Sequence, residues 1–128
     1  MNLQLLPLAE ENLKGARLAL YNGLLRVAAS CAYYAVYAAM WAYLGDPPKG
    51  RWAHGGITVA FLQRLHADFT EVDLVPYGYR ATRRKVEDLY AQRLQADYSV
   101  EPIDQEEVSA AVGFSEWLVS LIRVRCLL

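Results

Sequence analysis

The chain has 128 residues, of which 55% are hydrophobic and 21% charged, and its formal net charge is -1 at pH 7. This length predicts a single domain over residues 1–128, large enough to bury a core without disulfides or metals. The composition excludes a disordered chain. The near-neutral charge excludes a general attraction to nucleic acid or acidic membranes, so an anion-binding surface must come from local clusters of charge.

Two helices are predicted in the first third of the chain. Apolar residues at helical spacing predict the first over about Leu8 to Tyr21, and Asn22-Gly23 ends it. The second is predicted from about Leu24 to Leu44, where a Gly-Asp-Pro-Pro sequence stops it. Its last eighteen residues, Val27 to Leu44, carry no charge, which reaches the lower limit for a membrane span.

The composition of this central helix favours a buried core helix over a membrane span. Tyrosine hydroxyls lie along its middle, and in lipid each would need a partner inside a helix bundle. Alanines recur at spacings of three and four and leave one smooth face, at Ala28, Ala32, Ala35 and Ala39. A helix buried on both faces in so short a chain predicts contact with a second subunit, hence a homodimer, and no contact with a membrane.

Three further helices are predicted in the rest of the chain. The third spans about Gly56 to Asp68 and is expected to point three apolar side chains inward, those of Val59, Leu62 and Leu65. The short stretch Thr70 to Pro76 is the one strand-like segment, and the fourth helix is predicted from near Pro76 to about Tyr98. The fifth begins after Asp104, which is an N-cap followed by acids. Short connections between these helices predict an all-α, up-and-down bundle.

The cysteines and histidines of the chain form no cluster. Two cysteines, Cys31 and Cys126, are too few for a disulfide framework and favour a reduced, cytoplasmic protein. The N-terminal residues lack the basic and apolar regions of a signal peptide, which favours the same location. Because no histidine and cysteine pair has metal-ligand spacing, we expect no metal and no cofactor.

The fourth helix carries two charged residues on its apolar face. Arg93 and Asp97 lie one turn apart on the face that also holds Val86, Leu89 and Ala96, so both are expected to be partly buried. A buried charged residue is expected either to be paired with an opposite charge or to have a function. An acid near the C-terminal end of a helix opposes the helix dipole, so local helix stability does not explain Asp97. A structural ion pair and a functional polar site both remain open.

The other cations gather at two places. Arg80 and Arg84 share a face at the start of the fourth helix, where they either form a solvated surface with the following acids or contact the phosphates of RNA or a nucleotide. Lys49, Arg51 and His54 lie in a glycine-containing loop before a helix N-terminus, which could hold an anion. The spacing is not that of a Walker loop, and His54 has an alternative role as a capping or surface residue.

Four elements occur in order along the chain: an early helix ending in glycine, the segment Ser30 to Tyr37, the segment Lys49 to Ile57 with Phe61, and the segment Arg93 to Tyr98. Together they resemble the HEPN superfamily, in the branch of small stand-alone HEPN proteins of bacteria and archaea. The resemblance covers almost the whole chain. It implies an up-and-down four-helix bundle with an additional short helix, usually dimeric.

The resemblance also implies two kinds of function. Many HEPN domains are metal-independent ribonucleases, often toxins, which use an arginine, four to six further residues and then a histidine across a dimer cleft. Others pair with a minimal nucleotidyltransferase as a two-gene, toxin–antitoxin-like module, or bind nucleotides and RNA without cleaving them. The candidate residues for either function are Arg93, Asp97 and His54 for catalysis, and Lys49, Arg51, Arg80, Arg84, Tyr34 and Tyr98 for ligand or phosphate binding.

The sequence departs from the ribonuclease pattern after Arg93. No histidine follows within the motif, and Asp97 stands in its place. A carboxylate, with an ordinary pKa of about 3.9, does not simply replace an imidazole near neutral pH. We therefore predict a nucleotide- or RNA-binding partner of a nucleotidyltransferase that is non-catalytic or weakly catalytic. The alternatives are an RNase toxin that uses His54 from the loop, and a homodimerising structural adaptor.

Overall fold

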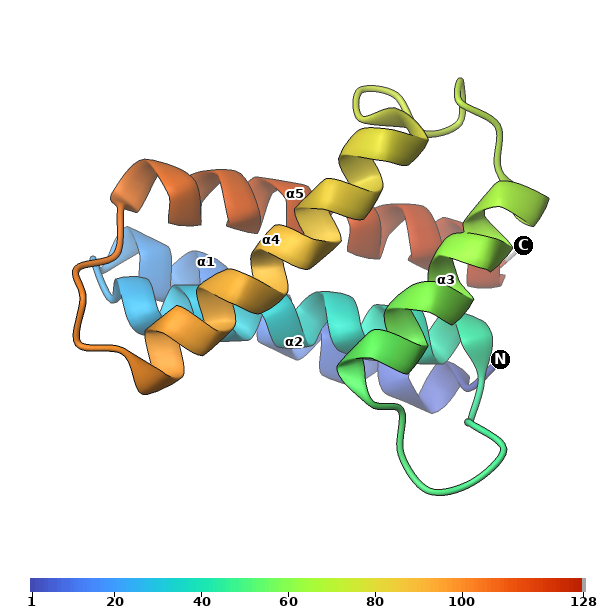
Figure 1. The fold of residues 1–128 in the computed structure, drawn as a ribbon, viewed down its shortest axis with the longest axis horizontal. Helices are drawn as coiled ribbons and strands as arrows, with labels where there is room; N and C mark the ends of the chain where they lie inside the picture. The colour runs from blue at the N-terminus through green and yellow to red at the C-terminus, as the bar shows by residue number, and fades with distance from the viewer. Residues whose placement is uncertain (128) are drawn as a thin grey trace.

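The computed structural model describes residues 1–127, and these residues form helices, turns and loops without a strand. A short 3-10 helix, Leu3–Leu5, precedes five α-helices: α1 (Leu6–Tyr21), α2 (Leu25–Leu44), α3 (His54–Asp68), α4 (Gly78–Tyr98) and α5 (Gln105–Leu127). In Figure 1, α1, α2 and α5 run alongside one another, α4 crosses in front of them, and α3 lies beside α4. The predicted all-α fold is confirmed.

Helix α2 is the centre of the core, as its charge-free sequence predicts. It contacts every other α-helix. Its predicted alanine face is fully buried, at Ala28, Ala32, Ala35 and Ala39. The absence of bulky side chains there lets a neighbouring helix approach closely, and the Ser115 hydroxyl of α5 donates a hydrogen bond of 3.1 Å to the backbone carbonyl of Ala32.

The same helix is long and apolar enough to cross a membrane by length and composition. Within α2, 61% of the window that meets this test is buried inside the folded chain. A helix that forms the core of a soluble bundle has the same composition, since its side chains contact other helices in place of lipid. Burial therefore accounts for the missing charges of Val27 to Leu44.

Three details of the segment between α2 and α4 differ from the predictions. Helix α3 begins at His54 and not at Gly56, so His54 belongs to a helix. Val59 was predicted to point inward but is 58% exposed, because the buried face is formed by Ile57, Thr58, Phe61 and Leu65. Both sets have helical spacing, and the face with the larger apolar surface is the one that packs. The strand-like stretch from Thr70 forms turns.

Helix α4 begins at Gly78, two residues later than predicted. Gly78 has a positive φ of 79°, and a Cβ at this position would lie 2.5 Å from a carboxylate oxygen of Glu71. A glycine is therefore required here. The Glu71 carboxylate accepts a hydrogen bond of 3.0 Å from the backbone N–H of Tyr79, which satisfies one of the free donors at the start of the helix.

Arg26 ties the C-terminal end of α4 to the start of α2. Its Nη1 donates hydrogen bonds to the carbonyls of Gln95 (3.2 Å), Ala96 (2.9 Å) and Ser99 (2.6 Å), and its Nη2 donates to that of Glu101 (2.7 Å). The last carbonyls of a helix have no partner within it, and a cation at this end also complements the helix dipole. Arg26 thereby fixes the part of α4 that carries Arg93 and Asp97.

Candidate functional site

Arg93 is held among side chains from α2 and α4. Its Nη2 donates a hydrogen bond of 2.8 Å to the Tyr34 hydroxyl, and its Nε lies 3.0 Å from Oδ2 of Asp97. The Nε–H is not aligned for a hydrogen bond to that oxygen, so the contact with Asp97 is an ion pair. The Arg93 side chain is 18% exposed, in agreement with its position on the apolar face of α4.

Asp97 is in turn fixed by α2. Its Oδ1 accepts a hydrogen bond of 2.6 Å from the Ser30 hydroxyl, while Oδ2 faces Arg93, and its side chain is 31% exposed. Burial by itself would lower the pKa of Arg93. The Tyr34 oxygen and the Asp97 carboxylate outweigh that effect, so that the pKa rises. The pair is a charged contact within reach of solvent.

Three tyrosine rings surround the Arg93 guanidinium. Its Cζ lies 5.7 Å from the ring centre of Tyr33, 5.4 Å from that of Tyr34 and 5.8 Å from that of Tyr98. A guanidinium within about 6 Å of an aromatic ring is attracted to its face. Tyr98 is 76% exposed, so one of these rings presents much of its surface to solvent beside the cation. We call these residues, together with Ser30, Asp97, His54 and Tyr90, the Arg93 cluster.

His54 joins this cluster through its neighbours. Its ring stacks on Tyr90, with the ring centres 3.5 Å apart, and its Nδ1 lies 3.1 Å from the Tyr33 hydroxyl. Burial raises the pKa of Tyr33, so the phenol keeps its proton near neutral pH. In the hydrogen-bond arrangement that follows, the Tyr33 hydroxyl donates to Nδ1 of His54, and the neutral imidazole carries its own proton on Nε2.

The stability of the folded chain should depend on pH through His54. Burial lowers the pKa of His54 below its usual 6.5 and the Arg93 cation lowers it further, while Glu87 acts in the opposite direction. Just below pH 6.5 the unfolded chain takes up a proton that the folded chain resists, so the free energy of unfolding should rise with pH there and level off above. Urea denaturation across about pH 5 to 8 measures this.

The matched control for this prediction is His54→Phe, which keeps an aromatic ring for the stack on Tyr90 and removes the titrating group. His66 is present in both proteins, so its contribution cancels in the difference. The variant should lose the slope that His54 contributes. An unchanged pH profile in His54→Phe would show that the imidazole does not titrate differently in the folded chain.

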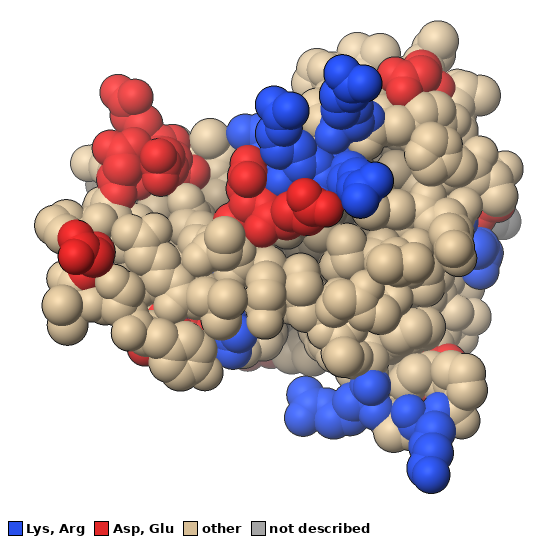
Figure 2. Space-filling view, viewed as in Figure 1, with Lys and Arg blue, Asp and Glu red and all other residues tan. Residues whose placement is uncertain are grey.

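The remaining predicted residues lie elsewhere. Lys49 and Arg51 are exposed in the loop before α3, and Arg84 is exposed on α4. Arg80 lines a pocket between α3 and α4. Figure 2 shows the largest groups of basic side chains over the N-terminal half of α4 and at the loop that leads into α3. The structure therefore brings Tyr34, His54, Arg93, Asp97 and Tyr98 together. No contact of Lys49, Arg51, Arg80 or Arg84 with this cluster is seen among the described residues.

Several residues that the structure places in or beside the cluster were not among the predicted site residues. Ser30 and Tyr33 lie in the segment that carries the family resemblance, and Tyr90 lies on the same face of α4 as Arg93. For all three residues, the position in the sequence was the feature that could have identified them as site residues. Arg26 also had such a feature, because it is the last charged residue before the long uncharged stretch of α2.

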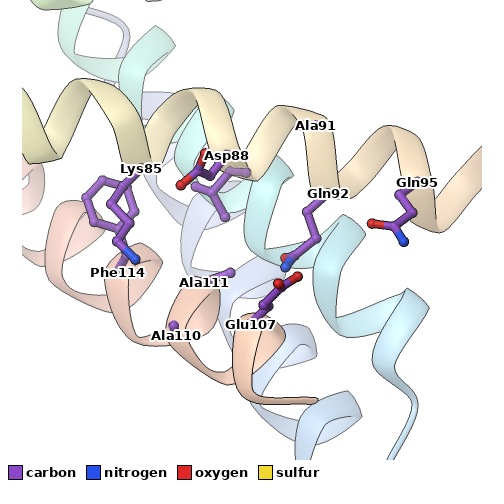
Figure 3. A pocket seen from close by; sticks show the side chains of 10 residues that line it. Lys85, Asp88, Ala91, Gln92, Gln95, Glu107, Ala110, Ala111 and Phe114 are labelled. Atoms are coloured by element: carbon purple, nitrogen blue, oxygen red, sulfur yellow. The ribbon is translucent and has the colours of Figure 1, made fainter. Parts of the chain in front are cut away.

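A separate pocket of about 380 Å³ lies between α4 and α5. Figure 3 shows Gln92 of α4 and Glu107 of α5 reaching toward each other across it. Oε1 of Gln92 is buried without a hydrogen-bond partner among the described residues. No lining residue belongs to the Arg93 cluster. Across residues 1–127, no three histidine, cysteine or acidic side chains gather in the manner of metal ligands.

Comparison with models of known protein families places the chain in one of them. The family model described as HEPN domain matches residues 4–125 of the chain. The match includes all members of the Arg93 cluster. No curated protein matches the sequence.

Proposed function

The chain belongs to the HEPN family, and on that premise we propose that it binds RNA or a nucleotide through the Arg93 cluster without cleaving it. One observation carries the proposal. A partly buried guanidinium is oriented by Tyr34 and Asp97 and flanked by tyrosine rings. Arginine recognises phosphate oxygens through paired donors, and exposed tyrosine rings stack on bases.

Asp97 supports a binding role more than a catalytic one. Its two carboxylate oxygens are occupied by Ser30 and Arg93, whereas a general base must reach the proton that it removes. The carboxylate also occupies the guanidinium that a phosphate would bind. Asp97 therefore acts as an internal anion, which an incoming phosphate displaces from Arg93.

A substitution of Asp97 tests this arrangement. Asp97→Asn removes the competing charge and keeps an oxygen for the Ser30 hydroxyl, so it should tighten the binding of a labelled single-stranded RNA by about threefold to tenfold. Fluorescence anisotropy measures the affinity. Asp88→Asn makes the same charge change at an exposed position of the same helix and serves as the control. Equal affinities in the two variants would refute the role of Asp97 as internal anion.

The proposal includes two protein partners, a second copy of the chain and a minimal nucleotidyltransferase. The nucleotidyltransferase rests on the resemblance to HEPN proteins that form such two-gene modules. Exposed apolar side chains beside the cluster also favour a protein contact, since Val27 on α2 and both Tyr98 and Val100 at the end of α4 are largely uncovered. Co-purification with the product of a neighbouring nucleotidyltransferase gene tests the nucleotidyltransferase as a partner. Light scattering tests whether two copies of the chain associate.

One observation favours a ribonuclease as the second candidate function. His54 is neutral near pH 7 because of its lowered pKa, and it contacts the same Tyr33 ring as Arg93. To take a proton from a ribose hydroxyl, this imidazole would first have to exchange the Tyr33 hydroxyl at Nδ1 for that substrate group, because its Nε2 already carries a proton. RNA incubated with the purified protein in EDTA separates the two functions. If the wild type cleaves RNA and both Arg93→Ala and His54→Ala abolish the cleavage, the protein is a ribonuclease and the proposal of binding without cleavage is refuted.

A further inference from the structure

Helices α3 and α4 pack along a line of contact, here called the seam, which has a histidine ring stacked on a tyrosine ring at each end. His54 stacks on Tyr90 with ring centres 3.5 Å apart, and His66 stacks on Tyr79 with ring centres 4.0 Å apart. These are the two histidines of the chain. At 1.5 Å per residue, the two stacks are separated by about 17 Å along either helix.

A groove of about 460 Å³ opens between α3 and α4 from the His66–Tyr79 end of this seam. Its walls are formed by Val59, Leu62, Gln63 and His66 of α3, and by Tyr79, Arg80 and Arg83 of α4. Val59, predicted to be a core residue, is instead an exposed apolar part of one wall. The groove thus combines an apolar side, an aromatic end and two guanidinium groups.

The cations on the α4 side are not explained by helix stability. Arg80, Arg83, Arg84 and Lys85 occupy the first two turns of α4, and the first turn contains no acid. Cations at this end oppose the helix dipole, and Arg80 lies in the first turn, where that effect is largest. Of the two in the groove, Arg83 forms an exposed ion pair of 3.3 Å with Glu87, which is a weak contact. Arg80 has no ion-pair partner in the described part of the chain.

Tyr79 is partly buried against the core, and three contacts fix its position. Its hydroxyl donates to the carbonyl of Phe69, its backbone N–H donates to Glu71, and its ring is covered on one face by His66. A ring held in this way loses little conformational entropy when a ligand packs against it. The end of the groove is therefore a preformed aromatic wall next to two guanidinium groups.

We propose that the groove between α3 and α4 is a second binding site, specific for a nucleoside phosphate. The phosphate contacts Arg80 and Arg83, and the base packs against Val59, Leu62 and the His66–Tyr79 stack. The seam leads from this groove to the His54–Tyr90 stack, which belongs to the Arg93 cluster. One RNA strand can therefore occupy both sites, and this last step rests on the proposed function of the Arg93 cluster.

Calorimetry with AMP tests the groove through the part of the binding that depends on Arg80, because the Arg93 cluster is itself proposed to bind a nucleotide. Arg80→Ala should weaken AMP binding about tenfold, because it removes a charge-assisted contact to the phosphate. Arg84→Ala removes the same charge from an exposed position one turn further along α4 that does not line the groove, and should change the affinity less than twofold. Inorganic phosphate should bind more weakly than AMP, because it lacks a base. Equal losses in the two arginine variants, or equal affinities for the two ligands, would overturn the proposal.

A third variant separates the groove from the Arg93 cluster. Arg93→Ala should leave the Arg80-dependent binding of AMP unchanged. AMP binding that is lost in Arg93→Ala and retained in Arg80→Ala would overturn the groove and leave the proposed function standing. With a single-stranded RNA, a loss of affinity in each single variant and a larger one in the double variant supports one strand across both sites. If Arg80→Ala weakens the binding of AMP but leaves the affinity for RNA unchanged, the ligand of the groove is a free nucleotide.

Discussion

Replacing Arg93 by alanine is expected to weaken RNA binding by about tenfold to a hundredfold. The variant removes a hydrogen bond from a charged donor to phosphate, worth about 1.5–3 kcal/mol, and leaves the Asp97 carboxylate unpaired beside the ligand. Arg93→Lys keeps the charge but not the paired donors, so its affinity should lie between those of the wild type and the alanine variant. Fluorescence anisotropy with a labelled single-stranded RNA measures all three.

Arg17→Ala is the matched control for this experiment. Arg17 is an exposed arginine on α1 that pairs with Glu116 of α5, outside the Arg93 cluster. It should change the affinity less than twofold, since a single distant charge contributes little at physiological salt. A loss in Arg17→Ala as large as that in Arg93→Ala would mean that RNA responds to overall charge and not to the cluster.

Replacing Arg26 by alanine is expected to cost about 2–4 kcal/mol of the free energy of unfolding. The substitution leaves the carbonyls of Ala96, Ser99 and Glu101 without the guanidinium donor and removes one of two donors to that of Gln95. It also removes a cation from the negative end of the α4 dipole. Urea denaturation of wild type and variant gives the difference. Arg26→Lys should recover only part of the loss, because one ammonium does not reproduce a planar guanidinium that bonds four carbonyls.

A small effect of Arg26→Ala would contradict this account. A loss below about 0.5 kcal/mol is typical of a substitution at an unremarkable surface position, and it would mean that water replaces the guanidinium at the end of α4. The cluster provides a second readout. Asp97 and Tyr98 lie on the last turn of α4 that Arg26 holds, so RNA affinity should fall together with stability in the alanine variant.

The features that follow from local pattern could be predicted from the sequence. A long charge-free segment rich in alanine must be covered on several sides, which placed Val27 to Leu44 in the core. Arg93 and Asp97 interrupt an apolar face, which indicated their partial burial before any contact was known. In both cases one helix carries the information, because hydrophobic periodicity reports which face is covered.

The features that depend on two distant segments could not be predicted. Arg26 bonds carbonyls that lie about seventy residues further along the chain, and His54 stacks on Tyr90 of another helix. Only the three-dimensional topology brings these groups together. The inward position of Val59 was predicted wrongly for a different reason, whereas Leu65 is buried as predicted. Two helical stripes fit the sequence of α3, and packing against α2 selects the one with Ile57 and Phe61 over the one with Val59.

The most direct test of the central claim is an NMR titration that follows the Nε–H resonance of Arg93 while single-stranded RNA is added. We predict that this resonance shifts and saturates along the same curve as the anisotropy, because phosphate replaces the Asp97 carboxylate at the guanidinium. The Nε–H resonance of Arg17 should stay in place over the same titration. A resonance of Arg93 that does not move while RNA saturates the protein would contradict the claim that the Arg93 cluster is the binding site.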